Sequence, residues 1–538
     1  MPADIGRDAR LRGNQIAAAQ GAIMPPVAQI DSCHARTPAA SAPPAGNRGL
    51  AVLIAVTMPV LFGVVSGIFT PRGPVTTGEA LTTMALALAI GVIAGAAVRS
   101  RWAIVFVPVV FIAALEVTRM PITGPTVDAV RLDTQLGWIA FVTGRGIHGL
   151  LAVAPLILGA IFGAAYARRH KRELAAPRRF TQRIGLYSRR TLTALLTLTL
   201  IALALGVARP AGTDPIVDAD GTALPGSIAE LTTVTLDGRE LGVMIRGHDV
   251  RNPILMFVAG GPGGSELGAM RRHLSALEHD FTVVTLDQRG TGKSYAELDP
   301  ASTLTFDRGV SDVIDLASYL RERFGTDSIY LVGQSYGSLV GVRAAQQRPD
   351  LFTAYIGVGQ MVSPAETDQI TYLDTLAWAR ASGNREVIEE LTAIGPPPYE
   401  RMSDYEPVLT HETPDVYPYD HSVNSEGAGQ FSENLFVREY TLLEQIHALG
   451  AFMDVASILY PQLQEIDLRV DALKLDIPVY LMQGRFEARG RAELAEEWFD
   501  MVQAPHKEVL LFDTSGHRPL FEQPEVFHDA MVRIEGQR

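Results

Sequence analysis

The sequence predicts an α/β fold, with a mainly parallel sheet and an inserted helical cap, preceded by an all-α transmembrane region. Apolar runs concentrate in the first 210 residues, whereas strand-like and helix-like segments alternate through residues 211–538. Mostly helical sequence between Gly359 and Leu475 interrupts that alternation. Charge divides the chain at the same place: there are 21 basic and 8 acidic residues up to Pro210, and 25 basic and 51 acidic residues after it. The acidic half argues against nucleic acid as a partner.

Residues 1–49 are rich in Ala, Pro, Arg and Gly and show no hydrophobic periodicity. We therefore expect a disordered cytoplasmic leader. A secretory signal fits poorly, because no apolar core occurs before residue 50. The single cysteine, Cys33, lies in this leader, which excludes an intramolecular disulfide framework and makes a catalytic cysteine a poor expectation.

Five apolar runs then predict a transmembrane region over residues 50–208 that serves as an anchor. The runs are residues 50–69, 80–98, 102–117, 149–167 and 192–208. A bilayer crossing needs about 20 apolar residues. The third run is the shortest and ends beside Glu116, so it is the weakest candidate. Any one run could be a buried globular helix, but five in succession favour a membrane region and a lipid bilayer as partner.

Positive charge predicts the orientation of these runs. Residues 168–190 carry nine Lys and Arg, and the leader carries five arginines, so both are expected on the cytoplasmic side. Four crossings separate the two segments, and a fifth places everything from residue 209 onward outside the cell membrane. The number of crossings is odd, as this orientation requires, only if the short third run spans the membrane.

A linker at 209–226 is expected to lead into an α/β domain at 227–538, with its cap at about 360–475. The strand candidates are IAELTTVTL, LGVMIRG, PILMFVAG, FTVVTLDQ, SIYLVGQ, AYIGVG, IPVYLMQG and KEVLLFDTSG. Helix-like stretches lie between several of them, which is typical of a parallel sheet covered on both faces.

The nucleophile candidate is Ser335. The segment GQSYG at 333–337 follows a strand and precedes a helix, which is the context that gives G-x-S-x-G its meaning. Such a turn exposes the serine hydroxyl at a helix N-terminus, where negative charge is favoured. The alternative is a tight turn with a structural serine.

A glycine-rich loop, AGGPGGS at 259–265, follows the strand PILMFV. Its backbone N–H groups, together with that of Tyr336, could form an oxyanion hole, and we assign Gly261 and its neighbour Gly260 to it. A flexible loop is the alternative. A phosphate-binding loop does not fit, because neither the Walker nor the dinucleotide spacing is present, and GTGKS at 290–294 lacks the upstream glycine.

Together, AGGPGGS, DQRGTGKS and GQSYGS resemble the prolyl-aminopeptidase group of the α/β-hydrolases, over about residues 227–538. IGPPPY in the cap is similar to that of bacterial membrane-anchored members of this group. The resemblance implies an α/β-hydrolase fold with a serine nucleophile. The family usually has a histidine where this chain has Ala259, which puts the geometry of the oxyanion loop in question.

This fold orders its triad as serine, acid, then histidine. His517 follows the last predicted strand and precedes a helix, in a context similar to the family's G-H ending. Glu487 follows the preceding strand within MQGRFEARG, where the family usually has aspartate. Asp476 precedes that strand and Asp513 lies in the strand leading to the histidine, so both are poorer candidates for the acid.

The resemblance implies acidic groups that hold a substrate's free amine, one of which often follows the catalytic acid. Here that position is Ala488, so Glu465 and Asp467 in the cap are the remaining candidates. The missing anchor weakens an aminopeptidase interpretation relative to a general esterase or amidase. No metal-ligand motif such as H-E-x-x-H occurs, and no cofactor is expected.

Two functions remain open from the sequence. The first is a membrane-anchored serine hydrolase that acts on a small-molecule or peptide substrate outside the cell membrane. The second is a membrane sensor or binding protein with a degenerate hydrolase domain, motivated by Ala259 and Glu487. Transport by the apolar helices is a weaker third, because apart from Glu116 they lack buried charges.

Overall fold

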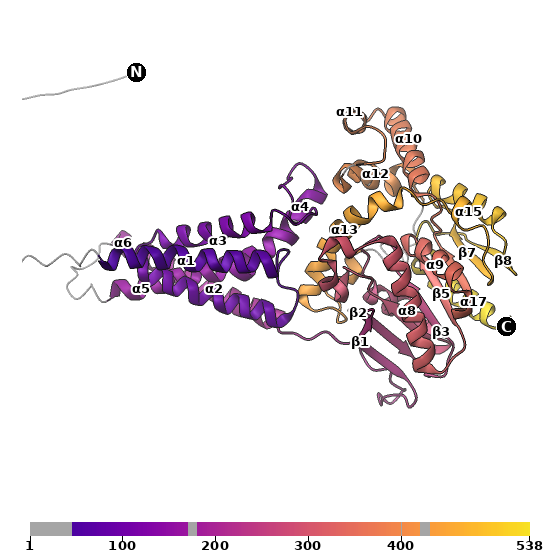
Figure 1. The fold of residues 1–538 in the computed structure, drawn as a ribbon, viewed down its shortest axis with the longest axis horizontal. Helices are drawn as coiled ribbons and strands as arrows, with labels where there is room; N and C mark the ends of the chain where they lie inside the picture. The colour runs from indigo at the N-terminus through magenta and orange to yellow at the C-terminus, as the bar shows by residue number, and fades with distance from the viewer. Residues whose placement is uncertain (1–45, 170–179, 400, 420–430, 538) are drawn as a thin grey trace, which may run out of the picture. The chain divides into compact units, whose positions relative to one another are not determined.

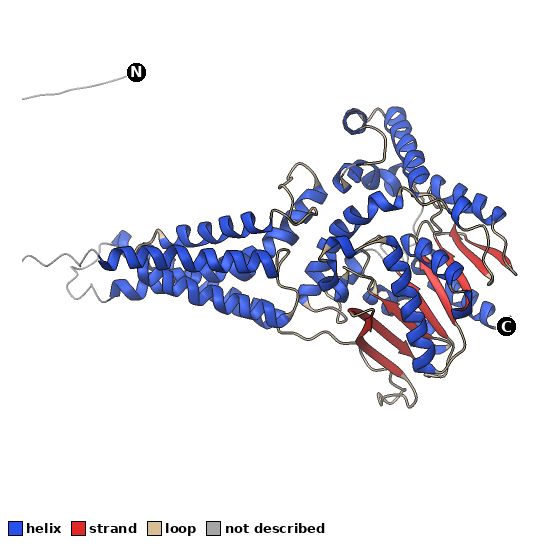
Figure 2. Cartoon of the chain, viewed as in Figure 1, coloured by secondary structure: helices blue, strands red, loops and turns tan. Residues whose placement is uncertain are grey.

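A central eight-stranded sheet organises the second half of the chain in the computed structural model, which describes residues 46–169, 180–399, 401–419 and 431–537 (Figures 1 and 2). The strand order is β1-β2-β4-β3-β5-β6-β7-β8. Strands β1 and β2 pair antiparallel, as do β2 and β4, and all other pairs are parallel. The strands are β1 (Ile228–Leu236), β2 (Arg239–Gly247), β3 (Ile254–Val258), β4 (Thr282–Leu286), β5 (Ile329–Gln334), β6 (Phe352–Val358), β7 (Val479–Gly484) and β8 (Lys507–Phe512). The mainly parallel sheet predicted from the alternating pattern is confirmed.

Helices cover both faces of this sheet (Figure 2). Side chains of the central strands alternate between two cores, with Met256 in one and Leu255 and Phe257 in the other. The first core includes residues of α8, α9 and α15, and the second includes residues of α7 and α17. These helices are α7 (Leu267–His273), α8 (Phe306–Phe324), α9 (Tyr336–Gln347), α15 (Arg489–Met501), α16 (Pro519–Glu522) and α17 (Pro524–Glu535). Both faces of the sheet are thus covered by apolar side chains and excluded from water, as a parallel sheet requires.

The segment between β6 and β7 is helical where it is described. Its helices are α10 (Pro364–Ser382), α11 (Arg385–Ile394), α12 (Glu406–His411), α13 (Leu442–Leu463) and α14 (Leu468–Asp471). Helix α13 begins with a capping box formed by Thr441 and Glu444. Its residues Ala451 and Val455 join the first core of the sheet.

The first half of the chain is all-α. Its helices are α1 (Gly46–Phe69), α2 (Thr77–Val98), α3 (Ala103–Arg119), α4 (Gln135–Phe141), α5 (Ala154–Arg169) and α6 (Phe180–Val207). Two π-helical turns, Val142–Gly146 and Gly149–Val153, lie between α4 and α5, and the helix runs through Gln135–Arg168. Glycines bring α2 and α5 close: a Cβ on Gly91 would lie 2.3 Å from the Leu156 carbonyl oxygen, and one on Gly159 would lie 2.2 Å from that of Leu88.

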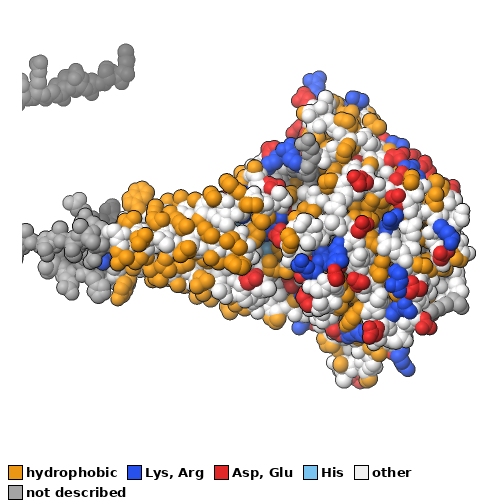
Figure 3. Space-filling model, in the orientation of Figure 1, with side chains coloured by type: hydrophobic (Ala, Val, Ile, Leu, Met, Phe, Trp, Pro, Cys, Tyr) orange, Lys and Arg blue, Asp and Glu red, His pale blue; other side chains and the backbone are white. Residues whose placement is uncertain are grey.

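Five described helices are long and apolar enough to cross a membrane: Gly49–Phe69, Thr77–Val98, Gln135–Arg168, Gly185–Val207 and Leu442–Leu463. Four of them contain runs that the sequence singled out. The fifth is α13, whose residues in the first core of the sheet explain its apolar character. Helix α3 contains the short third run and has 17 residues. The visible face of α1–α6 carries mainly apolar side chains (Figure 3). The leader expected at 1–49 lies almost wholly outside the described residues.

Candidate active site

Ser335 lies at the sharp turn between β5 and α9, with φ 52° and ψ −120°. This positive φ is rare for a residue with a side chain. The turn closes tightly against its surroundings. A Cβ on Gly333 would lie 2.4 Å from the Gly337 carbonyl oxygen, and one on Gly337 would lie 2.2 Å from that of Val258. Both glycines of GQSYG are therefore required by close backbone approach, and they present Ser335 at the end of the central strand.

His517 lies in the loop between β8 and α16, and its Nε2 is 2.9 Å from the Ser335 Oγ. Two side chains from the following helices hold this loop. The Glu522 carboxylate accepts from the Gly516 backbone N–H at 2.9 Å, and the Gln523 side chain accepts from the Ser515 hydroxyl at 2.8 Å. The loop that carries His517 is thus held by residues of the same C-terminal segment.

Glu487 lies after β7, and its Oε2 is 2.6 Å from the His517 Nδ1. Its other oxygen accepts from the Ala488 backbone N–H and from the Arg491 Nε, both at 2.8 Å. The loop reaches the histidine closely, because a Cβ on Gly484 would lie 1.9 Å from the Gly516 carbonyl oxygen. His517 therefore lies within hydrogen-bond distance of both Ser335 and Glu487, and the glutamate reaches the histidine despite its extra methylene.

Arg491 was not singled out from the sequence, and it holds Glu487 in its charged form. Burial raises the pKa of the Glu487 carboxyl, but the charges and hydrogen bonds of Arg491 and His517 outweigh burial and lower this pKa to about 2. Arg491 also donates to Glu412, which lies between α12 and the rest of the cap, with one contact at 3.1 Å. The i,i+4 spacing of Glu487, just before α15, and Arg491, in its first turn, was the available signal.

A cavity of about 320 Å³ opens at the Ser335 hydroxyl. The oxyanion candidates Gly260, Gly261 and Tyr336 line it together with Ser335 and His517. Gly261 has φ +121°, a backbone conformation that favours glycine. Tyr336 is the first residue of α9, where a backbone N–H has no partner within the helix. The Ala259 carbonyl, at the position where the family has histidine, accepts from the Gln288 side chain at 2.8 Å.

Three carboxylates that the sequence analysis did not identify line the same cavity. Glu412 pairs with Arg491, and Glu266 pairs with Arg518. The second oxygen of Glu266 is buried and has no hydrogen-bond partner in the described part of the chain. Asp368 accepts from two tyrosine hydroxyls and from the Gln464 side chain. Burial outweighs these hydrogen bonds and raises the pKa of Asp368 to about 6.

The two cap acids expected to contact substrate, Glu465 and Asp467, are not among the residues that line this cavity. Asp467 is the N-cap of α14, where it accepts from the Arg469 backbone N–H at 2.9 Å, and it also pairs with the Arg469 guanidinium. The assignment is therefore corrected: spacing in the sequence identified acids near the end of α13, whereas folding turns Asp368, Glu412 and Glu266 toward Ser335.

Comparison with known proteins identifies the family of this chain. A protein named probable aminopeptidase YbaC, from Bacillus subtilis, is 28% identical over 310 residues, which cover 57% of this chain and 96% of that protein. A probable proline iminopeptidase from Leptolyngbya boryana is 31% identical over 96 residues, or 18% of this chain and 28% of that protein. A crystal structure of a proline iminopeptidase-related protein from Thermus thermophilus covers 56% of this chain and 96% of its own, with 20% identity and a TM-score of 0.41. The model of the alpha/beta hydrolase fold family matches residues 253–524, just over half of the chain, which therefore belongs to that family and is a hydrolase.

Proposed function

We propose that the protein is a membrane-anchored serine hydrolase, with a triad of Ser335, His517 and Glu487, that cleaves an ester or amide bond through an acyl-enzyme. The observation that carries this proposal is the continuous hydrogen-bonded chain from the Ser335 Oγ to the His517 ring and on to the Glu487 carboxylate, at 2.9 and 2.6 Å. These separations are within the reach that proton transfer needs.

The chemistry follows from the proton positions. With one ring proton on Nδ1, donated to Glu487, the His517 Nε2 can accept the Ser335 proton as the serine oxygen attacks the substrate carbonyl. The backbone N–H groups of the 260–261 loop and of Tyr336 would stabilise the resulting oxyanion. His517 then donates its proton to the leaving group. In the second half of the reaction, water attacks the acyl-enzyme, and His517 takes the proton of the water and returns it to Ser335.

Aminoacyl amides and short peptides are the substrates that the cavity favours. Glu266 and Asp368 place carboxylate oxygens in the cavity, where a substrate's ammonium group could bind. The names of the two relatives, an aminopeptidase and a proline iminopeptidase, point to the same class. Ala488 occupies the position where an amine-binding acid would be expected. Glu266 and Asp368 would therefore have to bind the substrate's amine instead of that acid.

Anchoring in a membrane is supported by the apolar helices. Four long apolar helices lie in the first half, and α3 adds a fifth of 17 residues, or about 26 Å at the usual helical rise. Large apolar side chains of these helices are exposed, among them Leu53, Leu86, Val109, Phe162 and Leu198. The bilayer would cover this surface, and the hydrolase half would lie outside the cytoplasm.

A fluorophosphonate probe tests the proposal on the full chain in detergent. We expect stoichiometric labelling of the wild type and none of Ser335→Ala, because only an activated serine reacts. Ser311→Ala, which removes an exposed hydroxyl from α8, is the matched control and should label normally. A substrate panel of aminoacyl arylamides and short-chain esters then ranks the two classes. A folded wild type that neither labels nor turns over either class would favour the alternative of a binding protein.

A further inference from the structure

A second cavity, of about 760 Å³, lies on the other side of helix α13 from the candidate active site. Its walls come from the segment that joins α3 to α4, from α4 itself and from α13. Met453, Ser457 and Ile458 of α13 line it, whereas Phe452, Ala456 and Tyr460 of the same helix line the cavity at Ser335. Its volume falls within the range of about 300–1,000 Å³ that small-molecule sites occupy.

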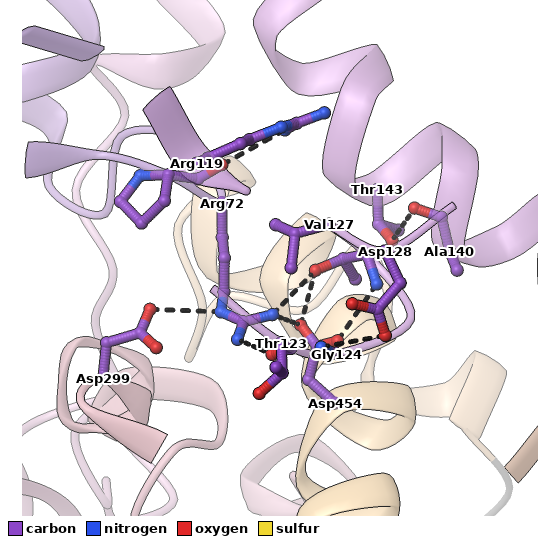
Figure 4. A network of polar contacts seen from close by, with 12 residues as sticks. Arg72, Arg119, Thr123, Gly124, Val127, Asp128, Ala140, Thr143, Asp299 and Asp454 are labelled. Carbon is purple, nitrogen blue, oxygen red and sulfur yellow. Dashed lines mark hydrogen bonds and ion pairs between the residues drawn. The ribbon is translucent and has the colours of Figure 1, made fainter. Parts of the chain in front are cut away.

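A buried polar network lies next to the residues that line this cavity (Figure 4). Buried Arg72, from the α1–α2 connection, donates to the Asp454 carboxylate at 2.6 Å and to the Thr126 hydroxyl at 3.0 Å. Thr126 in turn donates to Asp454, at 3.1 Å from its backbone N–H and 2.6 Å from its hydroxyl. Because these groups bond to one another, they hold the neighbouring lining residues Pro125 and Met453 in place.

The lining is mostly apolar, with one unmet polar group. Apolar contributions include Val130, Leu136, Phe141, Met453 and Ile458. The Ser457 hydroxyl is buried and has no hydrogen-bond partner among the described residues. A buried hydroxyl without a partner costs free energy, so a ligand that supplies one polar atom beside an apolar body would be favoured here.

Three arginines line the cavity. They are Arg131, Arg145 and Arg401, and Asp128 is the single acid among the described residues that line it. Arg145 is compensated by Glu116, and Arg131 by Asp133 and Asp404. Arg401 pairs with Asp404 through its Nε, and its side chain is 62% exposed, so an anionic head group could reach its guanidinium.

We propose that this cavity binds a single-chain anionic amphiphile, with the acyl chain against the apolar lining and a carboxylate or phosphate head at the arginines. Large apolar side chains at the same segment are exposed, namely Val130, Leu132, Trp138 and Val142. This segment connects two of the helices assigned above to the membrane, so its apolar surface lies where lipid would be the neighbouring solvent. The inference rests on the proposed membrane anchoring.

The test is photolabelling of the full chain in lipid nanodiscs with a diazirine-bearing C16 fatty acid. Ser335 is first blocked with fluorophosphonate, which keeps the probe out of the active site. Adducts should map to Met453, Ile458 and the 125–141 segment.

Ser457→Phe, which fills the cavity, should reduce that labelling at least five-fold. Thr392→Phe, at an exposed position of α11, is the matched control and should leave it unchanged. Ala140→Leu fills the opposite wall and replaces Ser457→Phe if that variant fails to fold.

The head group is tested separately. A diazirine fatty alcohol of the same length should label several-fold less, and equal labelling would overturn the anionic assignment. Competition by lysophospholipid but not by free fatty acid would identify a phosphate head group. Competition by free fatty acid but not by lysophospholipid would identify a carboxylate head group. Adducts spread evenly over the apolar helices, unchanged by Ser457→Phe, would overturn the site altogether. Fluorophosphonate labelling of the same samples reports the reactivity of Ser335 independently. Retention in carbonate-washed membranes reports the anchoring. A cavity that binds no amphiphile can therefore be distinguished from a failure of the proposed function.

Discussion

Glu487 is the residue on which the proposed triad depends most, because its carboxylate faces the histidine from one oxygen and Arg491 from the other. Glu487→Gln keeps the shape but removes the charge that stabilises the imidazolium. We expect kcat to fall by about 10²–10⁴-fold, as when a triad acid is neutralised in other serine hydrolases. Turnover of the best panel substrate measures this.

The control for that variant is Glu493→Gln, on the exposed face of α15, where the carboxylate pairs only with Arg489 among the described residues. It should retain wild-type turnover with the same melting temperature. If Glu487→Gln kept near wild-type kcat, another acid would have to serve His517.

Arg491 is expected to help set the pH range of the proposed triad. Burial raises the pKa of Glu487, but the charges and hydrogen bonds of Arg491 and His517 lower it to about 2. Removing the arginine charge in Arg491→Met should raise this pKa, so that Glu487 becomes protonated at a higher pH and the acid limb of the kcat/KM profile moves upward. For the wild type, the lowered pKa means that ionised Glu487 stabilises the fold above about pH 4, the usual carboxyl value, and that this contribution is lost as pH falls toward 2.

Arg489→Met is the comparison for the pH profile, since Arg489 lies two residues away and pairs with Asp374 and Glu493 instead of Glu487. Its acid limb should coincide with that of the wild type. An Arg491→Met profile that dropped in height without any displacement in pH would show that Arg491 positions Glu487 without tuning it.

At the scale of elements, the strands and the elbow could be predicted because their signals are local. The central strands are short apolar runs, and the glycine spacing that marks the turn at Ser335 lies within five residues of sequence. The cavity carboxylates could not be predicted in this way. Asp368 and Glu412 line the cavity at Ser335 only because of the way the segment between β6 and β7 folds. Arg491 pairs with Glu412, which lies 79 residues earlier in the chain. Long-range pairing of this kind leaves no periodicity in the sequence.

Helix α13 illustrates the same limit and leads to a prediction about stability. Its Asp454 is fully buried and paired with Arg72, which lies 382 residues earlier in the chain (Figure 4). Arg72→Met would leave a buried carboxylate without its cation, a change that costs about 3–5 kcal/mol when a buried pair is broken. We expect a clear fall in the melting temperature of the purified full chain, followed by intrinsic fluorescence.

The matched variant is Arg251→Met, which breaks an exposed ion pair with Asp249. Exposed pairs contribute little, so its melting temperature should equal that of the wild type. An unchanged melting temperature for Arg72→Met would mean that the loop between α1 and α2 does not hold α13 in place.

For the whole molecule, the charge division and the helices lead to one topology. The basic leader and the basic 168–190 segment are expected inside. Five helical spans between residues 46 and 207, with Gln135–Arg168 counted as one, would then leave the acidic hydrolase half outside. Two features decide this parity. Helix α3 must span although it has 17 residues, and α13 must not span although it is long and apolar. The burial of Asp454 and the core contacts of Ala451 on α13 favour its place in the hydrolase half.

Cysteine labelling tests this topology, because Cys33 is the only cysteine in the chain and lies in the leader. In intact bacterial cells, a membrane-impermeant maleimide should leave Cys33 unlabelled until the cells are lysed. In a Cys33→Ser background, Thr392→Cys at an exposed position of α11 should be labelled before lysis, once the outer barrier is made permeable. Labelling of both positions only after lysis would place the leader and the hydrolase half on the same side, which an even number of crossings requires, and α3 would then be the helix that does not span.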